Sequence, residues 1–207
     1  MKKQGVFILF FLTGLIVSAI HPHDYFTWIL EVFPAIIGFV LLLVTFRKFR
    51  FTDLAYVLIL IHCYILFVGG HYTYAEVPLF NWIKELLHQH RNNYDKVGHF
   101  AQGFIPAVIV REIFIRKEIV KKGVWLSLLT ICVCLSISVF YEFLEWFVAI
   151  ASGQSADAFL GTQGDVWDTQ SDMLFAFIGA TCMNVFLGGM HDKQIGRLRS
   201  FSGNTNV

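Results

Sequence analysis

The chain has 207 residues, of which 56% are hydrophobic and 16% aromatic, whereas only 15% are charged. Its mean hydropathy of +0.61 is too high for an ordinary soluble domain. Its formal net charge of +1 gives no reason to expect a nucleic-acid partner. The composition therefore indicates a single integral membrane domain over residues 1–207, surrounded by membrane lipids.

Apolar stretches close to bilayer length recur along the chain, and a spanning helix needs roughly 17–25 mainly apolar residues. These stretches cover residues 5–20, 26–46, 54–70, 97–115, 123–149 and 171–190. Helices satisfy their own backbone hydrogen bonds in hydrocarbon, so we predict an all-α, polytopic bundle of about six transmembrane helices. The first stretch, which follows Lys2 and Lys3, also resembles a signal peptide that would be cleaved near residue 19.

The lysines and arginines of the loops predict the orientation of this bundle. If the amino terminus is cytoplasmic, the inner regions hold twelve basic residues and the outer regions only three, Lys84, Arg91 and Lys96. Cytoplasmic loops carry the excess of basic residues in membrane proteins. We therefore expect a multi-pass protein with both termini in the cytoplasm.

An amphipathic segment, LFNWIKELLHQHR, lies between the third and fourth predicted spans. Its apolar residues recur at helical spacing and are Leu79, Trp82, Ile83, Leu86 and Leu87. This pattern predicts one interfacial helix on the outer leaflet, with Trp82 at the membrane boundary. A helix folded over the end of the bundle is the alternative.

Acidic residues and one histidine gather at the outer ends of the last three predicted spans. The group consists of Asp95, His99, Glu142, Glu145, Asp165, Asp168 and Asp172. Spacings of three and four residues put the members from each span on one helix face. Ionisable groups in membrane helices usually face the bundle interior or a polar cavity. Because the three spans are consecutive, we expect these side chains to surround one outward-facing cavity.

Carboxylates that share a cavity repel one another, so protons or positive charges must accompany them. Carboxylate oxygens with one imidazole suit Mg²⁺, Mn²⁺ or a carboxylate-rich Zn²⁺ site. All seven residues are therefore candidate ligands of a divalent metal ion, and Arg91 and Lys96 are the alternative counter-charges. His99, Asp95 and Glu142 are the candidate catalytic residues, because they could exchange protons with a metal-bound water.

Structural roles compete with this interpretation. Taken alone, Asp95 and His99 are more typical of a hydrogen bond that anchors a helix end. Acids in the first turn of a helix also interact favourably with its dipole. That effect accounts for one or two of the three aspartates in GDVWDTQSDM, but not for all three together with two glutamates.

Four blocks of the sequence resemble the YjdF-like family of bacterial inner-membrane proteins. They are HYTYAEVP, NNYDKVGHFAQGF, YEFLEW and GTQGDVWDTQSDM, and the resemblance extends over essentially the whole chain. It implies a polytopic fold in the inner membrane, and it implies no particular activity.

A second, more limited resemblance is to the VanZ-like membrane proteins. Asp95, Lys96 and His99 match their D-K-x-x-H pattern, and Asp172 with Gly179 matches the acid that leads into their final helix. Glu142 and Glu145 approximate the acid and amide groups of the helix between these elements. Two departures are Ala176, where those proteins have an asparagine, and Asp165, near where an arginine is common. The glycopeptide resistance associated with that family is therefore not carried over.

Three functions fit these observations. The first is a membrane enzyme or lipid-modifying protein with a metal or headgroup site at the outer face. The second is a non-catalytic structural or stress-response protein of the envelope, held together by its polar cluster. A small-solute or ion transporter comes third, because beyond His62 and the Arg111–Glu112 pair the inner half of the predicted bundle is apolar. No nucleotide loop, nucleophile motif or HExxH motif identifies a substrate.

Overall fold

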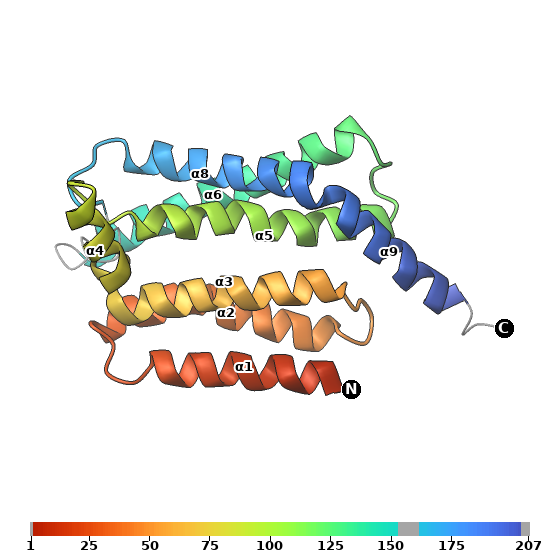
Figure 1. Ribbon diagram of the computed structural model, residues 1–207, viewed down its shortest axis with the longest axis horizontal. Coiled ribbons are helices and arrows are strands. Elements are labelled where there is room, and N and C mark those ends of the chain that lie inside the picture. The colour runs from red at the N-terminus through yellow and green to blue at the C-terminus, as the bar shows by residue number, and fades with distance from the viewer. Residues whose placement is uncertain (1, 153–161, 204–207) are drawn as a thin grey trace.

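The computed structural model of the protein describes residues 2–152 and 162–203, and all the regular structure in these ranges is helical. The long helices run back and forth along the molecule (Figure 1). They are α1 (Lys2–Ser18), α2 (Tyr25–Thr45), α3 (Asp53–Tyr72), α5 (Tyr94–Arg116), α6 (Val124–Ser152) and α8 (Asp168–Cys182), which continues through η3 (Met183–Leu187) into α9 (Gly188–Gly203). The short elements η1 (Tyr74–Glu76) and α4 (Pro78–Leu86) join α3 to α5. The prediction of an all-α membrane bundle is confirmed.

Each of the six predicted apolar stretches coincides with one of the long helices. Those that are long and apolar enough to cross a membrane are Tyr25–Thr45, Asp53–Tyr72, Val124–Ala151 and Asp168–Leu198. The apolar part of α1 is shorter. The 23 residues of α5 include charged side chains near both ends, and Asp95, Lys96, Arg111 and Glu112 are buried inside the protein. Membrane crossing by α1 and α5 therefore stays a prediction.

Three helices begin at residues that are suited to a helix start. Two of these residues accept a hydrogen bond from a free backbone N–H group, and the third is a proline, which has no N–H. The Asp24 carboxylate accepts a hydrogen bond from the Thr27 backbone N–H at 2.7 Å at the start of α2. The Thr52 hydroxyl accepts one from the Ala55 N–H at 3.3 Å at the start of α3. Pro78 occupies the first turn of α4, where its missing N–H costs nothing.

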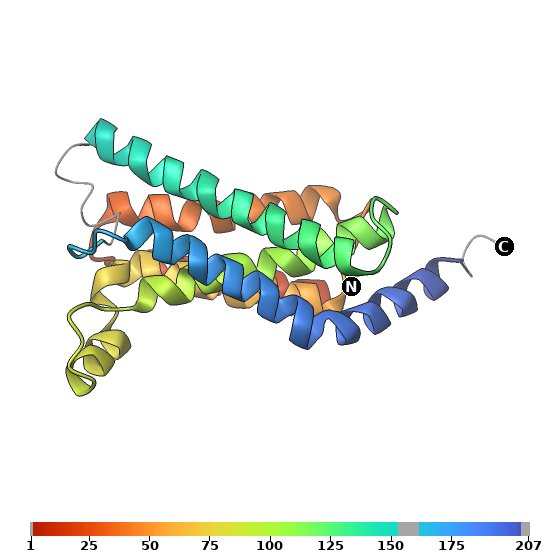
Figure 2. The ribbon, with the colours of Figure 1, turned by 90° about the horizontal axis from the view of Figure 1, so that it is seen from above.

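The helices form two layers, one of α1, α2 and α3 and the other of α5, α6 and α8 (Figures 1 and 2). Helices α1 and α2 pack on α3, whereas α6 and α8 pack on α5. The layers meet where α3 packs on α5. This arrangement puts the starts of α5 and α8 and the end of α6 at the same end of the bundle.

Small residues bring α5 and α8 into backbone contact. A Cβ atom on Gly103 would collide with the backbone oxygen of Ala176, and one on Gly179 would collide with the backbone oxygen of Phe100. Close approach through glycine and alanine is a common way to pack membrane helices.

A π-helical turn, η3, separates α8 from α9. The Asn184 amide in this turn donates a hydrogen bond to the Ala180 carbonyl at 2.9 Å. Helix α9 leaves the bundle at an angle to α8 (Figure 1). Such wide turns are a recognised cause of helix bends.

At the inner end of the predicted bundle, the expected Arg111–Glu112 pair is the centre of a larger polar network. Glu112 on α5 is fully buried and accepts hydrogen bonds from the Thr52 backbone N–H at 3.0 Å, the Thr52 hydroxyl at 2.8 Å and Arg116 at 2.8 Å. His191 Nε2 lies 3.1 Å from the same carboxylate. The neighbouring Arg111 pairs with Asp192 of α9 at 2.6 Å. These groups join α3, α5 and α9.

Helix α4 is amphipathic, as predicted, but it ends at Leu86, and His88 shortly after it has a positive φ of 52°. Leu79, Trp82 and Leu86 are each about 60% exposed. Apolar side chains that pointed into the bundle would be buried, so this exposure favours the interfacial helix over the alternative.

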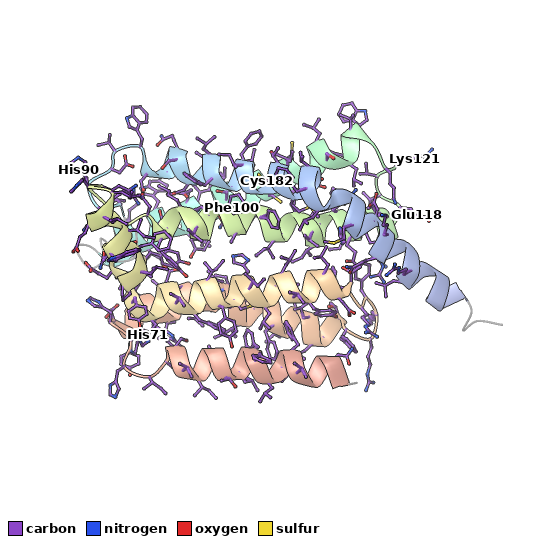
Figure 3. All side chains as sticks on the ribbon, in the orientation of Figure 1. His71, His90, Phe100, Glu118, Lys121 and Cys182 are labelled. Atoms are coloured by element: carbon purple, nitrogen blue, oxygen red, sulfur yellow. The ribbon has the colours of Figure 1, made fainter. Side chains whose placement is uncertain are left out.

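Both ends of the described chain lie at one end of the bundle, and His90 lies at the other (Figures 1 and 3). From the basic loops, we expect the terminal end to be cytoplasmic. A green fluorescent protein fused after Val207 should fluoresce, and alkaline phosphatase inserted after His90 should be active. Reporter signals that place Val207 and His90 on the same side of the membrane would contradict this orientation.

Candidate functional site

The predicted acidic group lies at the end of the bundle that carries α4. It is contributed by the first turns of α5, the last part of α6, the first turns of α8 and the loop before α8. Of the seven predicted residues, only Asp165 is substantially accessible, and the others are buried. The expected outward-facing cavity is therefore wrong for most of the group, because helix packing closes over it.

Lys96 provides much of the positive charge for these acids. Its Nζ lies 2.7 Å from Asp172 Oδ1, 2.9 Å from Asp168 Oδ1 and 3.6 Å from Asp95 Oδ2. It also donates a hydrogen bond to the Ser171 hydroxyl at 2.6 Å. A buried lysine needs such partners, because burial alone disfavours its charged form.

Arg91 provides the second positive charge. Its Nη1 lies 2.5 Å from Asp168 Oδ1 and 3.1 Å from Asp165 Oδ2, and its Nη2 lies 3.4 Å from Asp95 Oδ2. Burial disfavours the charged guanidinium, but hydrogen bonding to Asp168 and the nearby carboxylates outweigh it and raise the pKa of Arg91. The backbone N–H of Trp167 and the charge of Arg91 lower the pKa of Asp165. This surface carboxylate is therefore ionised at neutral pH.

Asn92 fixes the loop that carries Arg91. This fully buried side chain donates hydrogen bonds to the Val77 carbonyl at 3.0 Å and to Asn81 Oδ1 at 2.9 Å. Its backbone exchanges two hydrogen bonds of 2.9 Å with the Gln163 side chain. The segments before α4, α5 and α8 are thereby tied together, and Arg91 is held over the aspartates.

The two ring nitrogens of His99 contact different residues. Its Nε2 lies 3.2 Å from Asp95 Oδ1 and 3.7 Å from Asp172 Oδ2. Its Nδ1 lies 3.2 Å from Gln102 Oε1 and 3.9 Å from Glu142 Oε1. Asp95, His99 and Asp172 each offer a ligand atom within 4.8 Å of the others, which meets the geometric requirement for a metal ion.

One further acid, Glu31 of α2, belongs to this buried group but was not among the predicted site residues. It is 4% exposed, accepts a hydrogen bond from the Tyr141 hydroxyl at 3.4 Å and interacts electrostatically with Asp95 and His99. An acid within a predicted span was the signal that could have identified it. The α6 acid Glu145 interacts electrostatically with His99 and Glu31.

The buried acids outnumber the bases that face them. The acids are Glu31, Asp95, Glu142, Glu145, Asp168 and Asp172. Against these six stand Arg91 and Lys96, with His99 as a third base if it is protonated. Glu142 is 8% exposed, and its Oε1 has no hydrogen-bond partner among the residues that the structure describes. The two bases thus neutralise the aspartates of α8 but leave at least three acids for protons or another cation.

Comparison with known proteins identifies a family that the sequence matches. A family model described as "Predicted membrane protein (DUF2238)" matches residues 4–193. The chain belongs to this family. It is 49% identical over 189 residues to the "Inner membrane protein YjdF" of Escherichia coli (strain K12), covering 91% of this chain and 90% of that protein. No solved structure gives a significant match.

Membership in this family confirms the YjdF-like resemblance, whereas the comparisons do not show the VanZ-like one. Together with the apolar helices, the inner-membrane relative supports a multi-pass protein of the inner membrane. The family description names no activity, so an account of function must come from the buried charges.

Proposed function

We propose that this protein binds a divalent cation through Asp95, His99 and Asp172 and uses it to act on lipid headgroups at the outer face of the inner membrane. The observation that carries the proposal is that two carboxylate oxygens converge on one imidazole nitrogen inside a cluster with surplus acid.

The distances between the donor atoms support a metal of the size of Zn²⁺ or Mn²⁺. Such ions hold ligands at roughly 2.0–2.2 Å, so neighbouring ligands lie roughly 3.0–3.5 Å apart. The separations from His99 Nε2 to Asp95 and Asp172, 3.2 Å and 3.7 Å, need only a small adjustment. One nitrogen and two carboxylates fit these ions better than a large oxygen-only site for Ca²⁺.

The surrounding contacts orient the three proposed ligands. His99 directs Nδ1 toward Gln102 and Glu142, which leaves Nε2 for a metal. Asp95 and Asp172 use their other carboxylate oxygens to contact Arg91 and Lys96. Outer contacts of this kind fix ring orientation and carboxylate direction in known metal sites. Asp165 and Asp168 face the two bases instead, so the proposal does not include them as ligands.

Three protein ligands would leave a coordination position for water or a phosphate oxygen. A divalent cation bound there would make the water nucleophilic near neutral pH. Glu142, with Oε1 free of hydrogen-bond partners among the described residues, is the proposed proton acceptor. The cation would also offset part of the surplus negative charge.

A structural role is the second candidate function, and the basic residues favour it. Lys96 of α5 contacts Asp168 and Asp172 of α8, and Arg91 contacts Asp168 and Asp165. These pairs connect the segments that begin the two helices. In this alternative, protons replace the cation and the cluster only holds the bundle together.

Metal binding can be tested on detergent-purified protein. After chelation and return of Zn²⁺ or Mn²⁺, we expect about one ion per chain by elemental analysis and a higher melting temperature. At a free ion concentration of 100 Kd the stabilisation would be about 2.7 kcal/mol. His99→Ala and Asp172→Asn should lose both the ion and the temperature increase.

Glu85→Gln is the matched control, because it removes an exposed acid at the same end of the bundle. It should bind the ion as the wild type does. If the wild type retains no ion and shows no temperature increase, the structural role is the correct account.

A further inference from the structure

A cavity of about 640 Å³ lies beside the buried cluster, between α5, α8 and the loops that precede them. Its lining changes from polar to apolar along the helices. The residues that line it are Arg91, Asn93, Lys96, Val97, Phe100, Asp165, Ser171 and Phe175. In both helices the charged and hydroxyl groups come first, and the phenylalanines lie one turn or more further along the chain.

The apolar part of this cavity lies near the close contact of α5 with α8. Phe100 lies beside α8 (Figure 3), three residues before Gly103, and Phe175 directly precedes Ala176. Because Gly103 meets the Ala176 backbone, the helices leave no space between them at that level. The cavity is therefore polar toward the end of the bundle and apolar toward its middle, which is the order of headgroup and acyl chain in a lipid.

The charged side chains that line it are two bases, Arg91 and Lys96, and one acid, Asp165. The Asp165 side chain is 33% exposed and the Arg91 side chain 12%. The Lys96 side chain is 10% exposed, and its Nζ donates a hydrogen bond of 2.6 Å to the Ser171 hydroxyl. A ligand that carries both an anionic and a cationic group matches this pattern better than one that carries either alone.

The carboxylates around these bases disfavour the binding of a purely anionic ligand. Arg91 and Lys96 contact Asp95, Asp165, Asp168 and Asp172, four carboxylates against two bases. A phosphate bound here would be repelled unless the same molecule brought a positive charge. A primary ammonium also donates hydrogen bonds to a carboxylate, whereas a quaternary ammonium has no N–H to donate.

We propose that this cavity binds a phospholipid with an ethanolamine headgroup, whose phosphate contacts Arg91 and Lys96 and whose ammonium contacts Asp165. The acyl chains then lie against Phe100 and Phe175. This inference names the lipid class for the proposed headgroup site, but lipid binding requires no metal. Lys96 connects the two sites, because it lines the cavity and contacts the proposed ligand Asp172 at 2.7 Å.

Native mass spectrometry of delipidated, chelated protein tests the proposal apart from the metal. The probes are phosphatidylethanolamine, phosphatidylcholine and phosphatidylglycerol with identical acyl chains. We expect phosphatidylethanolamine to bind about tenfold more tightly than the other two, as one charge-assisted hydrogen bond would give. Equal binding of the three lipids, or a preference for phosphatidylglycerol, would overturn the proposal.

Asp165→Asn should remove this preference without changing the melting temperature, because the side chain is at the surface. Asp165→Glu should retain the preference, and so should the control Glu85→Gln. If Asp165→Asn still prefers phosphatidylethanolamine tenfold, the assigned ammonium contact is wrong. Soluble glycerophosphoethanolamine should compete only weakly, since it lacks acyl chains. Competition equal to that of the lipid would show a site for a free headgroup and would also contradict the proposal.

Discussion

Gly103→Leu is expected to prevent formation of the folded bundle, whereas Gly38→Leu is expected to be tolerated. A side chain on Gly103 would overlap the backbone of Ala176, and a helix backbone cannot move aside as a flexible side chain can. Overpacking typically costs about 1–3 kcal/mol even where side chains can rearrange, so we expect a larger loss here. Gly38 lies on α2, and a Cβ added there has no heavy atom within 4 Å.

The comparison is best made by fluorescence-detected size-exclusion chromatography of tagged protein in mild detergent. Gly38→Leu should give the monodisperse peak of the wild type. Gly103→Leu should give aggregate or little extractable protein, and Gly179→Val should behave similarly because Gly179 meets the Phe100 backbone. A normal peak for Gly103→Leu would mean that α5 and α8 do not approach as closely as described.

Glu112→Ala is expected to destabilise the opposite end of the bundle by about 3–5 kcal/mol, the usual effect of removing one partner of a buried charge pair. The Glu112 carboxylate accepts hydrogen bonds from Thr52 and Arg116 and contacts His191. Without it, buried donors lose their acceptor. The free energy of unfolding can be measured by titration with sodium dodecyl sulfate in mixed micelles.

The control for this experiment is Glu85→Ala, which removes an exposed glutamate from a helix and should cost little. His191→Ala should also lower the free energy of unfolding by less in the Glu112→Ala background than in the wild type, because the contact between the two residues is already lost there. Additive effects would contradict the described network. A loss similar to that of Glu85→Ala would show that Glu112 has no stabilising role.

Local features of the sequence were sufficient to predict the helices. The long helices were predicted from apolar stretches of spanning length, and α4 was predicted from the helical spacing of apolar residues between 79 and 87. Both patterns depend only on neighbours in the chain, and the structure contains both kinds of helix. The gathering of acids from α5, α6 and α8 also followed from the order of the spans.

Contacts between distant parts of the chain could not be predicted in the same way. Glu112 meets Thr52 and His191, which are 60 and 79 residues away, and Glu31 meets Tyr141 across 110 residues. Arg91 and Lys96 were only the alternative counter-charges, because spacing does not reveal which carboxylate a long flexible side chain reaches. Whether the acids line an open cavity or lie buried depends on helix packing, and the close contact at Gly103 is not visible in a hydropathy pattern.

The π-helical turn η3 changes the rotational phase of the last helix. Each residue of an α-helix advances about 100° around its axis, so the extra residue of a wide turn rotates everything after it by about that angle. Small residues of α8 can therefore face α5 while His191 still faces Glu112 beyond the turn. In an alignment of relatives, a one-residue gap within 183–187 would look trivial. In three dimensions it would turn His191 and Ile195 out of their buried positions and present a different face of α9 to the bundle.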